Sequence, residues 1–442
     1  MTFRTETERQ PLPASGTPFS RCLLGLFCAA LLAPLLPSAV CAGPCQTFGL
    51  GGQAIAMGGA VAAHAEDYAA TFYNPAGLAF LGKATLGLGF IYGSPDLRIN
   101  GDTQDVDLIR AFQVGGSFGI GSEWFLSRIR LGVAAHIPTS TALLLGASDP
   151  IKPNYVLYTI DPQRMAIYMG GAVRILPSLS FGGGVSMLAE ADFNLNLSLA
   201  SSSFLTHYSP SRFNFDPILG IKFKPSESFS LAAVYREAKS ATLKPELRLF
   251  LGETQVVPTI TVYNLFGYEP REVVLAAMYR YRERLTLEVD VTWMDYSEFQ
   301  APTPKYEFEE PVPDWVKVLL SMENFPDAGF HDIYVPRVGA ELIVNRHVTL
   351  RGGYCYRPSP VPDQRGITNY ADSDKHVISV GGGLTVFLPA KLGSKPFHVD
   401  GVFQLHVLEE RAVVKEGPQD PVGDYTIDGE IFLGGIYIQF KF

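Results

Sequence analysis

The feature that most constrains this chain is an alternation of apolar with polar or small side chains, repeated in segments of about ten residues. Successive side chains of a strand point to opposite faces, so such a segment is a strand with one apolar face. In 285–293 the apolar set is Leu285, Leu287, Val289, Val291 and Trp293, and Thr286, Glu288, Asp290 and Thr292 alternate with it. Fourteen segments follow this pattern: 83–93, 108–120, 128–138, 164–175, 178–190, 212–224, 228–238, 271–281, 285–296, 334–344, 347–357, 376–388, 397–408 and 430–442. We interpret 241–263, which is also strand-like, as loop structure; a further pair of strands is the alternative.

The connections between these segments alternate in length. Those at 176–177, 225–227, 282–283 and 345–346 are short, whereas those at 94–107, 139–163, 191–211, 239–270, 297–333, 358–375 and 409–429 are long. Short turns at one end and long loops at the other are typical of up-and-down barrels of bacterial outer membranes. Closure of the sheet leaves no unpaired edge in lipid. The sequence therefore predicts an all-β fold, a 14-stranded antiparallel transmembrane β-barrel.

Composition excludes two other classes of protein. Hydrophobic residues make up 47% of the chain and charged residues 18%, but no internal segment offers the roughly 18 apolar residues of a spanning helix. A helical membrane bundle is therefore excluded. The formal net charge of −9 argues against a nucleic-acid partner, which needs a basic surface.

The two ends of the chain carry targeting features. Residues 1–42 have the layout of a signal peptide, with an apolar run from Cys22 to Leu36 and small residues before a cut that we place after Ala42. A retained membrane anchor is the alternative. At the other end, Phe440 and Phe442 close the last strand, as expected of a barrel that the outer-membrane insertion machinery recognises. The sequence leaves open whether Cys45 and Cys355 pair in the mature protein.

Residues 43–82 do not alternate and are rich in Gly and Ala. Small side chains allow close backbone packing, and the Asn74-Pro75-Ala76-Gly77 sequence favours a turn. We expect this segment to form a hatch inside the lumen, with the barrel running from 83 to 442. No strand precedes its Gly49-x-Gly51-x-x-Ala54 pattern, so a dinucleotide site is not expected.

The Gly/Ala-rich opening, the Asn74-Pro75-Ala76 turn, the end of the strand at 290–297 and the terminal Phe442 together resemble the FadL/TodX family of outer-membrane transporters. The resemblance covers 43–442 and implies 14 strands, a hatch in the lumen, and passive uptake of long-chain fatty acids or other hydrophobic compounds such as aromatic hydrocarbons and alkanes. It also implies a kinked third strand that lets cargo leave sideways. Here that strand is about 128–138, with Gly132, His136 and Pro138 at the expected lateral opening.

Apolar side chains in two long connections are candidates for cargo capture. One group is Leu143, Leu144 and Leu145; the other is Trp315, Leu319, Met322 and Phe325, which have helical spacing. The second group is either a cargo groove or a helix packed on the barrel rim.

Charged residues on the inward faces are expected to form a paired network between barrel and hatch; alternatively, one arginine meets a cargo carboxylate. The network comprises Arg236, Arg280, Glu288, Asp290, Arg337, Glu341 and Arg351.

No nucleophile, metal-ligand or phosphate-loop pattern is recognisable, so neither an enzyme nor a cofactor is expected. A general diffusion porin, a hydrolase that uses His331 and Asp332, and a structural barrel remain alternatives. The expected partners are hydrophobic cargo, outer-membrane lipid and lipopolysaccharide, and the barrel is expected to be a monomer.

Overall fold

The computed structural model describes residues 43–120, 128–139, 151–155, 157–158, 165–190, 193–198, 203–208, 212–243, 246–251, 254–299, 305–308, 329–387, 396–416 and 420–442. The expected signal segment, 1–42, lies outside these residues. No helix among them is both long and apolar enough to cross a membrane.

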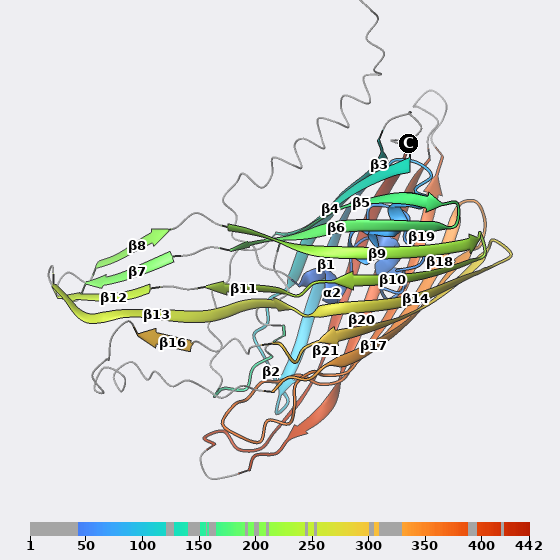
Figure 1. Cartoon of the computed structure of the whole chain (residues 1–442). Helices are drawn as coiled ribbons and strands as arrows, with labels where there is room; N and C mark the ends of the chain where they lie inside the picture. Colours follow the sequence, from blue (N-terminus) through green and yellow to red (C-terminus); the bar gives the residue numbers. More distant parts are fainter. Residues whose placement is uncertain are drawn as a thin grey trace, which may run out of the picture. The chain divides into compact units, whose positions relative to one another are not determined.

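Fourteen antiparallel strands form a closed ring in which each strand pairs with its neighbours in chain order (Figure 1). Pairing of the first strand with both the second and the last closes the ring, so the barrel has no free edge. The strands are β1 (Thr85–Ile99), β3 (Ile109–Gly119), β4 (Ile129–Pro138), β5 (Ala166–Leu176), β6 (Leu179–Glu190), β9 (Arg212–Ser226), β10 (Phe229–Arg236), β14 (Arg271–Tyr281), β15 (Leu285–Asp295), β17 (Ile333–Ile343), β18 (Val348–Arg357), β19 (Lys375–Val386), β20 (Phe397–Val413) and β21 (Tyr425–Lys441). All fourteen predicted segments are confirmed. β1, β20 and β21 are longer than predicted.

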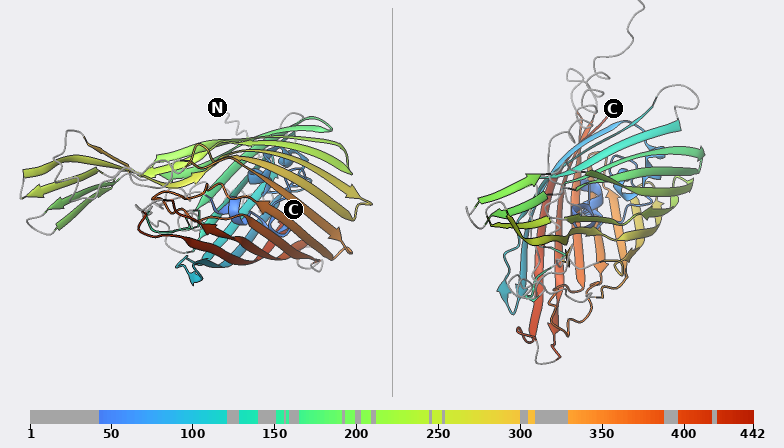
Figure 2. Two further views of the ribbon diagram at one scale, coloured as in Figure 1. Left: turned by 90° about the horizontal axis from the view of Figure 1, so that it is seen from below. Right: turned by 60° about the vertical axis from the view of Figure 1, so that its left-hand side comes forward.

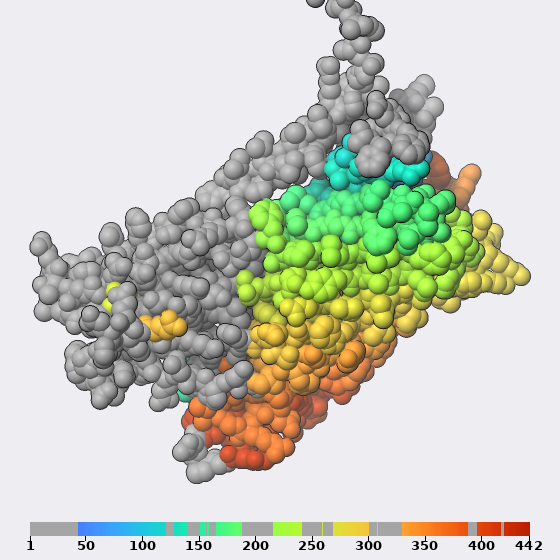
Figure 3. Space-filling view, in the orientation of Figure 1, coloured from blue at the N-terminus to red at the C-terminus, as the bar shows by residue number. Residues whose placement is uncertain are grey.

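Exposure alternates along the strands as the sequence predicts. Val289 on β15 is 51% exposed on the outer surface, whereas Glu288 and Asp290 beside it are only 1% and 2% exposed in the lumen. Neighbouring strands lie side by side across the outer surface in the space-filling view (Figure 3). The apolar side chains therefore face outward, where lipid accommodates them, and the charged ones face inward.

A second, smaller sheet corrects our interpretation of 241–263 as loop. β12 (Glu246–Leu251) and β13 (Thr254–Glu269) form an antiparallel hairpin, and β13 also pairs with β11 (Lys239–Leu243) and β16 (Lys305–Phe308). β12 pairs in parallel with β7 (Phe193–Ser198), which pairs with β8 (Ser203–Tyr208). β13 leads directly into β14, so one segment of the chain runs from this second sheet into the barrel (Figure 2). Three connections predicted as loops thus contribute strands. The two-residue strand β2 (Asp102–Thr103) pairs with the end of β1.

Residues 43–82 fill part of the lumen with short helices joined by turns. They are α2 (Pro44–Phe48), α3 (Gly52–Ala56), α4 (Ala70–Tyr73) and the 3-10 helix η2 (Pro75–Phe80). Most of their side chains are buried, and one apolar cluster joins Leu78 and Phe72 of this segment to Tyr168, Ile218 and Met278 of the wall. We refer to residues 43–82 as the hatch.

Candidate functional site

The Asn74-Pro75-Ala76-Gly77 turn rests on a bare patch of the barrel wall. Gly182 of β6 pairs with Gly220 of β9 in the sheet, and both face the turn. A Cβ atom added at Gly182 would lie 2.2 Å from the nitrogen of Ala76, and one added at Gly220 would lie 2.1 Å from Oδ1 of Asn74. Only glycine leaves room for a backbone to approach a sheet this closely. We call Gly182 and Gly220 the glycine seat.

Asn74 links two turns of the hatch to each other and to the barrel wall. Its Oδ1 accepts a hydrogen bond from the nitrogen of Ala76 at 3.1 Å and thereby caps η2. Its Nδ2 donates to the carbonyl of Ala62 at 2.9 Å and to that of Ile221 on β9 at 3.4 Å. The fully buried amide therefore links two hatch turns to one strand. At Gly77, a Cβ would lie 2.1 Å from the carbonyl oxygen of Ala65, so this position also needs glycine.

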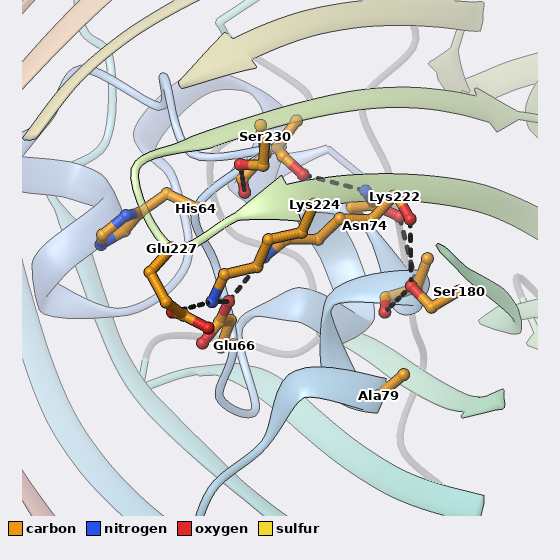
Figure 4. A network of polar contacts seen from close by, with 12 residues as sticks. His64, Glu66, Asn74, Ala79, Ser180, Lys222, Lys224, Glu227 and Ser230 are labelled. Carbon is orange, nitrogen blue, oxygen red and sulfur yellow. Dashed lines mark hydrogen bonds and ion pairs between the residues drawn. The ribbon is translucent and has the colours of Figure 1, made fainter. Parts of the chain in front are cut away.

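Charged side chains anchor the same half of the hatch (Figure 4). Glu66 Oε1 lies 2.9 Å from Nζ of Lys222 and 3.4 Å from Nζ of Lys224, both on β9. Burial raises the pKa of Glu66, but the two ammonium groups lower it by more, so the net shift is downward and the carboxylate stays charged. Ser180 Oγ donates to the carbonyl of Ala76 at 2.9 Å. These contacts tie the hatch to the β6–β9 wall.

The predicted lumen charges lie between the wall and the hatch. Arg236 pairs with Glu272, donates to the carbonyl of Phe72 at 2.7 Å and stacks on the Phe72 ring. Arg351 bridges Glu341 at 2.7 Å and Asp400 at 2.5 Å.

The remaining predicted charges contact backbone or hydroxyl groups. Glu288 and Asp290 accept hydrogen bonds from hatch amides, and Arg280 Nε donates to Thr286 Oγ1 at 3.2 Å. Arg337 donates to Thr292 Oγ1 at 2.5 Å. Of the predicted charged residues, Arg236, Glu341 and Arg351 therefore form ion pairs. The others, Arg280, Glu288, Asp290 and Arg337, bind backbone or hydroxyl groups.

A cavity of about 70 Å³ lies on the external side of the hatch, at the end of the barrel with the long connections. Hatch residues 45–49, Gly58, Gly59, Ala62, Phe72 and Tyr73 line it, together with strand residues that include Val274, Asp290, Thr292, Arg337, Arg357, Lys375 and Val377. The lining thus combines aromatic and aliphatic surface with charged side chains of both signs, Glu272 and Asp290 among them. We call this space the outer cavity.

Three cations of the outer cavity bind hydroxyl groups. Arg337 donates to Thr292, Arg357 to the Tyr296 hydroxyl, and Lys375 Nζ to the Tyr158 hydroxyl at 2.9 Å. No carboxylate in the described part of the chain lies within ion-pairing distance, 4.0 Å, of these three side chains. A carboxylate that entered the outer cavity could therefore accept hydrogen bonds from side chains that no described carboxylate contacts directly.

A larger cavity of about 420 Å³ lies on the periplasmic side of the hatch. Hatch residues 51–54, Val61 and 64–69 line it with charged side chains of the wall, among them Arg280, Glu341, Arg351, Asp400 and Lys441. Burial lowers the pKa of His64, another lining residue, below its ordinary value, so its imidazole is neutral at pH 7. We call this space the inner cavity.

The residues of the expected lateral opening lie on β4, which pairs without a register shift with β3 from Arg130 to Pro138 and with β5 from Ile129 to His136. Gly132 faces the hatch, where an added Cβ would lie 2.7 Å from Cγ2 of Thr71. His136 is fully buried, with Nδ1 3.2 Å from Nε2 of Gln113, and Pro138 stands opposite Ala111 at the external end. The lateral opening stays a prediction.

The other predicted site residues either lie outside the residues that the structure describes or lie on the barrel surface. The capture residues Leu143, Leu144, Leu145, Trp315, Leu319, Met322 and Phe325 lie outside the described residues. Phe440 pairs with Leu86 of β1, and its ring stacks on Phe442. The glycine seat, Arg357 and Lys375 were not predicted from the sequence. The glycine run at Gly182-Gly183-Gly184 inside a strand indicates a close backbone approach there, but not which segment makes it.

No arrangement typical of catalysis is present in the described ranges. No group of three or more His, Cys, Asp or Glu side chains is placed there to hold a metal ion. Asp332 accepts hydrogen bonds from Trp293 Nε1 and the nitrogen of Ser297, so its oxygens are engaged away from His331. Cys45 and Cys355 are both unpaired and buried, and burial raises the pKa of Cys45 to about 12, which keeps its thiol protonated.

A closed barrel with an apolar outer surface and a lumen occupied by its own leading segment defines a plugged outer-membrane barrel. The chain belongs to the outer membrane protein transport protein family (OMPP1/FadL/TodX), whose profile it matches over residues 40–392. Members of this family are transport channels of the bacterial outer membrane.

The chain is similar to two curated proteins over most of its length. It is 26% identical over 408 residues to alkane uptake protein A of Marinobacter nauticus, covering 85% of this chain and 86% of that protein. It is 22% identical over 427 residues to the long-chain fatty acid transport protein of Salmonella typhi, covering 88% and 91%.

Two solved structures share the fold. A Pseudomonas aeruginosa FadL homologue superposes with a TM-score of 0.58 at 17% identity, covering 92% of this chain and 99% of that one. The Pseudomonas putida toluene transporter TodX does so with a TM-score of 0.54 at 13% identity, covering 89% and 99%.

Proposed function

We propose that this protein takes up hydrophobic compounds passively across the outer membrane, with long-chain fatty acids, alkanes and aromatic hydrocarbons as the candidate cargo classes. Its membership in a family of transport barrels, together with a lumen blocked by the hatch, carries this proposal. The names of its relatives, an alkane uptake protein and a fatty acid transport protein, supply the cargo classes.

The cargo path runs from external capture to lateral exit. External apolar loop residues, including those around Leu143 and Trp315, collect the cargo, which then enters the outer cavity. Burying apolar surface of the cargo there gains about 25 cal/mol per Å². The cargo then leaves through the wall near Gly132, His136 and Pro138 after a local shift of the hatch.

Within this proposal, the outer cavity favours a cargo that carries a carboxylate. Arg337, Arg357 and Lys375 line it, and each donates to a hydroxyl group. A charge-assisted hydrogen bond contributes about 1.5–3 kcal/mol, which is enough to select a fatty acid over an alkane of equal length. Of the predicted lumen arginines, Arg337 is thus our candidate for the headgroup contact.

The alternatives receive less support. A general diffusion porin needs an open lumen, and the hatch occupies this one. A hydrolase would need an accessible nucleophile beside His331, and we infer that the protein is not an enzyme. We further propose that it is a monomer surrounded by outer-membrane lipid and lipopolysaccharide, and that the insertion machinery recognises Phe440 and Phe442.

Uptake by whole cells tests the proposal. A Gram-negative strain that lacks its own transporters receives this gene, and uptake of radiolabelled oleate, hexadecane and toluene is compared with that of a small sugar. Accelerated uptake of at least one hydrophobic compound, without faster sugar entry, is expected. The reverse pattern would identify a porin.

The carboxylate preference is tested with Lys375→Met. This variant keeps the apolar stem but loses the charge, so oleate uptake should fall about tenfold while hexadecane uptake stays unchanged. Lys152→Met, at an exposed external lysine, is the matched control. Equal loss for both compounds would refute the headgroup role.

A further inference from the structure

Residues 58–65 of the hatch contribute to the lining of both the outer and the inner cavity. Gly58, Gly59 and Ala62 line the outer cavity, whereas Val61, His64 and Ala65 line the inner one. The adjacent residues Val61 and Ala62 therefore face opposite cavities. We call residues 58–65 the partition turn.

Two carboxylates of one barrel strand hold the partition turn. Glu288 Oε1 accepts a hydrogen bond from the nitrogen of Ala63 at 2.6 Å. Asp290 Oδ2 accepts from the nitrogens of Val61 at 3.2 Å and Ala62 at 3.3 Å. Three consecutive amides thus bind two side chains that stand two residues apart on the lumen face of β15.

The remaining polar contacts of the partition turn involve its carbonyls and His64. The carbonyls accept from Asn74 at Ala62 and from Ser230 Oγ at Ala63, the latter at 2.9 Å. His64 Nε2 lies 2.7 Å from Gln53 Nε2 and 3.8 Å from a carboxylate oxygen of Glu341. The backbone amides of residues 61–63 are thus attached to the wall through Glu288 and Asp290.

Each of the two carboxyl groups also has one oxygen that the hatch amides do not use. These oxygens, Glu288 Oε2 and Asp290 Oδ1, are buried, and Asp290 lines the outer cavity. The two carboxyl groups also interact with each other. If the turn moved away, water from the two cavities could replace the amides at both groups.

We propose that the partition turn is a gate between the two cavities and that Glu288 and Asp290 are its latch. The route that it closes is polar, because charged groups line the inner cavity and much of the outer one. It conducts water and small ions directly to the periplasm, and it is distinct from any sideways exit of hydrophobic cargo. The protein would thus have a second, gated conduction activity.

Single-channel recording in planar lipid bilayers with KCl tests this proposal on the full mature chain. The double variant Glu288→Gln, Asp290→Asn replaces both carboxyl groups by amides and keeps the side-chain shapes. Openings should be at least tenfold more frequent than in the wild type. Asp295→Asn is the matched control, because Asp295 is a carboxylate of the same strand that binds Arg271 and Ser297.

The single variant Asp290→Asn, which retains Glu288, covers the case in which the double variant fails to fold. Hydrogen exchange of the peptide that contains residues 58–65 should also quicken in this variant but not in Asp295→Asn. Unchanged opening frequency together with unchanged exchange would overturn the proposal. Oleate uptake, measured in parallel, separates this outcome from failure of the transport proposal, which does not depend on the latch.

Discussion

Replacing Asn74 by Ala should release the hatch from the barrel wall. The substitution removes the cap of η2, which is worth about 1 kcal/mol. It also removes the donor to Ala62 and the longer bond to Ile221, at about 0.5–1.5 kcal/mol each. The seated state should therefore lose about 2–4 kcal/mol, which corresponds to a roughly 30- to 700-fold change in the opening equilibrium.

Hydrogen exchange followed by mass spectrometry measures this opening directly. Amides that exchange only when a segment opens do so in proportion to the open population. Peptides covering 61–80 should exchange roughly 30 to 700 times faster in Asn74→Ala, whereas strand peptides of the barrel should keep the wild-type rate. The barrel itself should remain folded, because its ladder does not include Asn74.

The matched control is Asn345→Ala in a periplasmic turn. Asn345 Oδ1 accepts from the nitrogens of His347 at 2.8 Å and Val348 at 3.0 Å, so this variant also loses two bonds to backbone amides. Exchange should quicken near residue 346 and stay unchanged in the hatch. Wild-type exchange of the hatch in Asn74→Ala, or equal acceleration of the hatch in both variants, would refute the anchoring role.

Three further predictions concern the glycine seat, the lipid-facing surface and the two buried thiols. Gly182→Ala would place a Cβ 2.2 Å from the backbone of the Asn-Pro-Ala turn, so hatch exchange should accelerate, while Gly401→Ala, with open space around it, should behave as wild type. Val289→Lys puts a charge on the lipid-facing surface and should lower the free energy of unfolding in lipid vesicles by about 2–4 kcal/mol, as measured by urea titration. Cys45 and Cys355 are only 2% and 7% exposed, so the folded protein should resist a maleimide reagent that labels both thiols after denaturation; rapid labelling would contradict their burial.

The barrel could be predicted from the sequence because lipid imposes one rule on every spanning strand. Val289 must be apolar and Glu288 must not face lipid, so the alternation marks each strand and its inward face. The hairpin at 246–269 does not span lipid, so this rule did not identify it. Fourteen segments already completed a barrel with alternating loop lengths, and nothing in those two features predicts a second sheet built from loops.

The glycine seat could not be predicted because it depends on register between strands. Gly182 and Gly220 are 38 positions apart in the chain and face the same hatch turn only because β6 and β9 pair as they do. The hatch could be recognised from its small residues and its Asn-Pro-Ala turn, but the wall that receives it depends on the shear of the closed barrel. The same limit applies to Arg357 and Lys375, which the pairing of β18 and β19 brings together.

Photolabelling would test the central claim, that cargo enters the lumen on the external side of the hatch. A fatty acid with a photoreactive group near its carboxylate is bound to the purified protein, irradiated, and located by mass spectrometry. The account predicts labels on hatch residues such as Phe72 and on the strand ends that carry Arg357 and Lys375, with competition by unlabelled oleate. Labels confined to lipid-facing residues such as Val289, without competition, would contradict it.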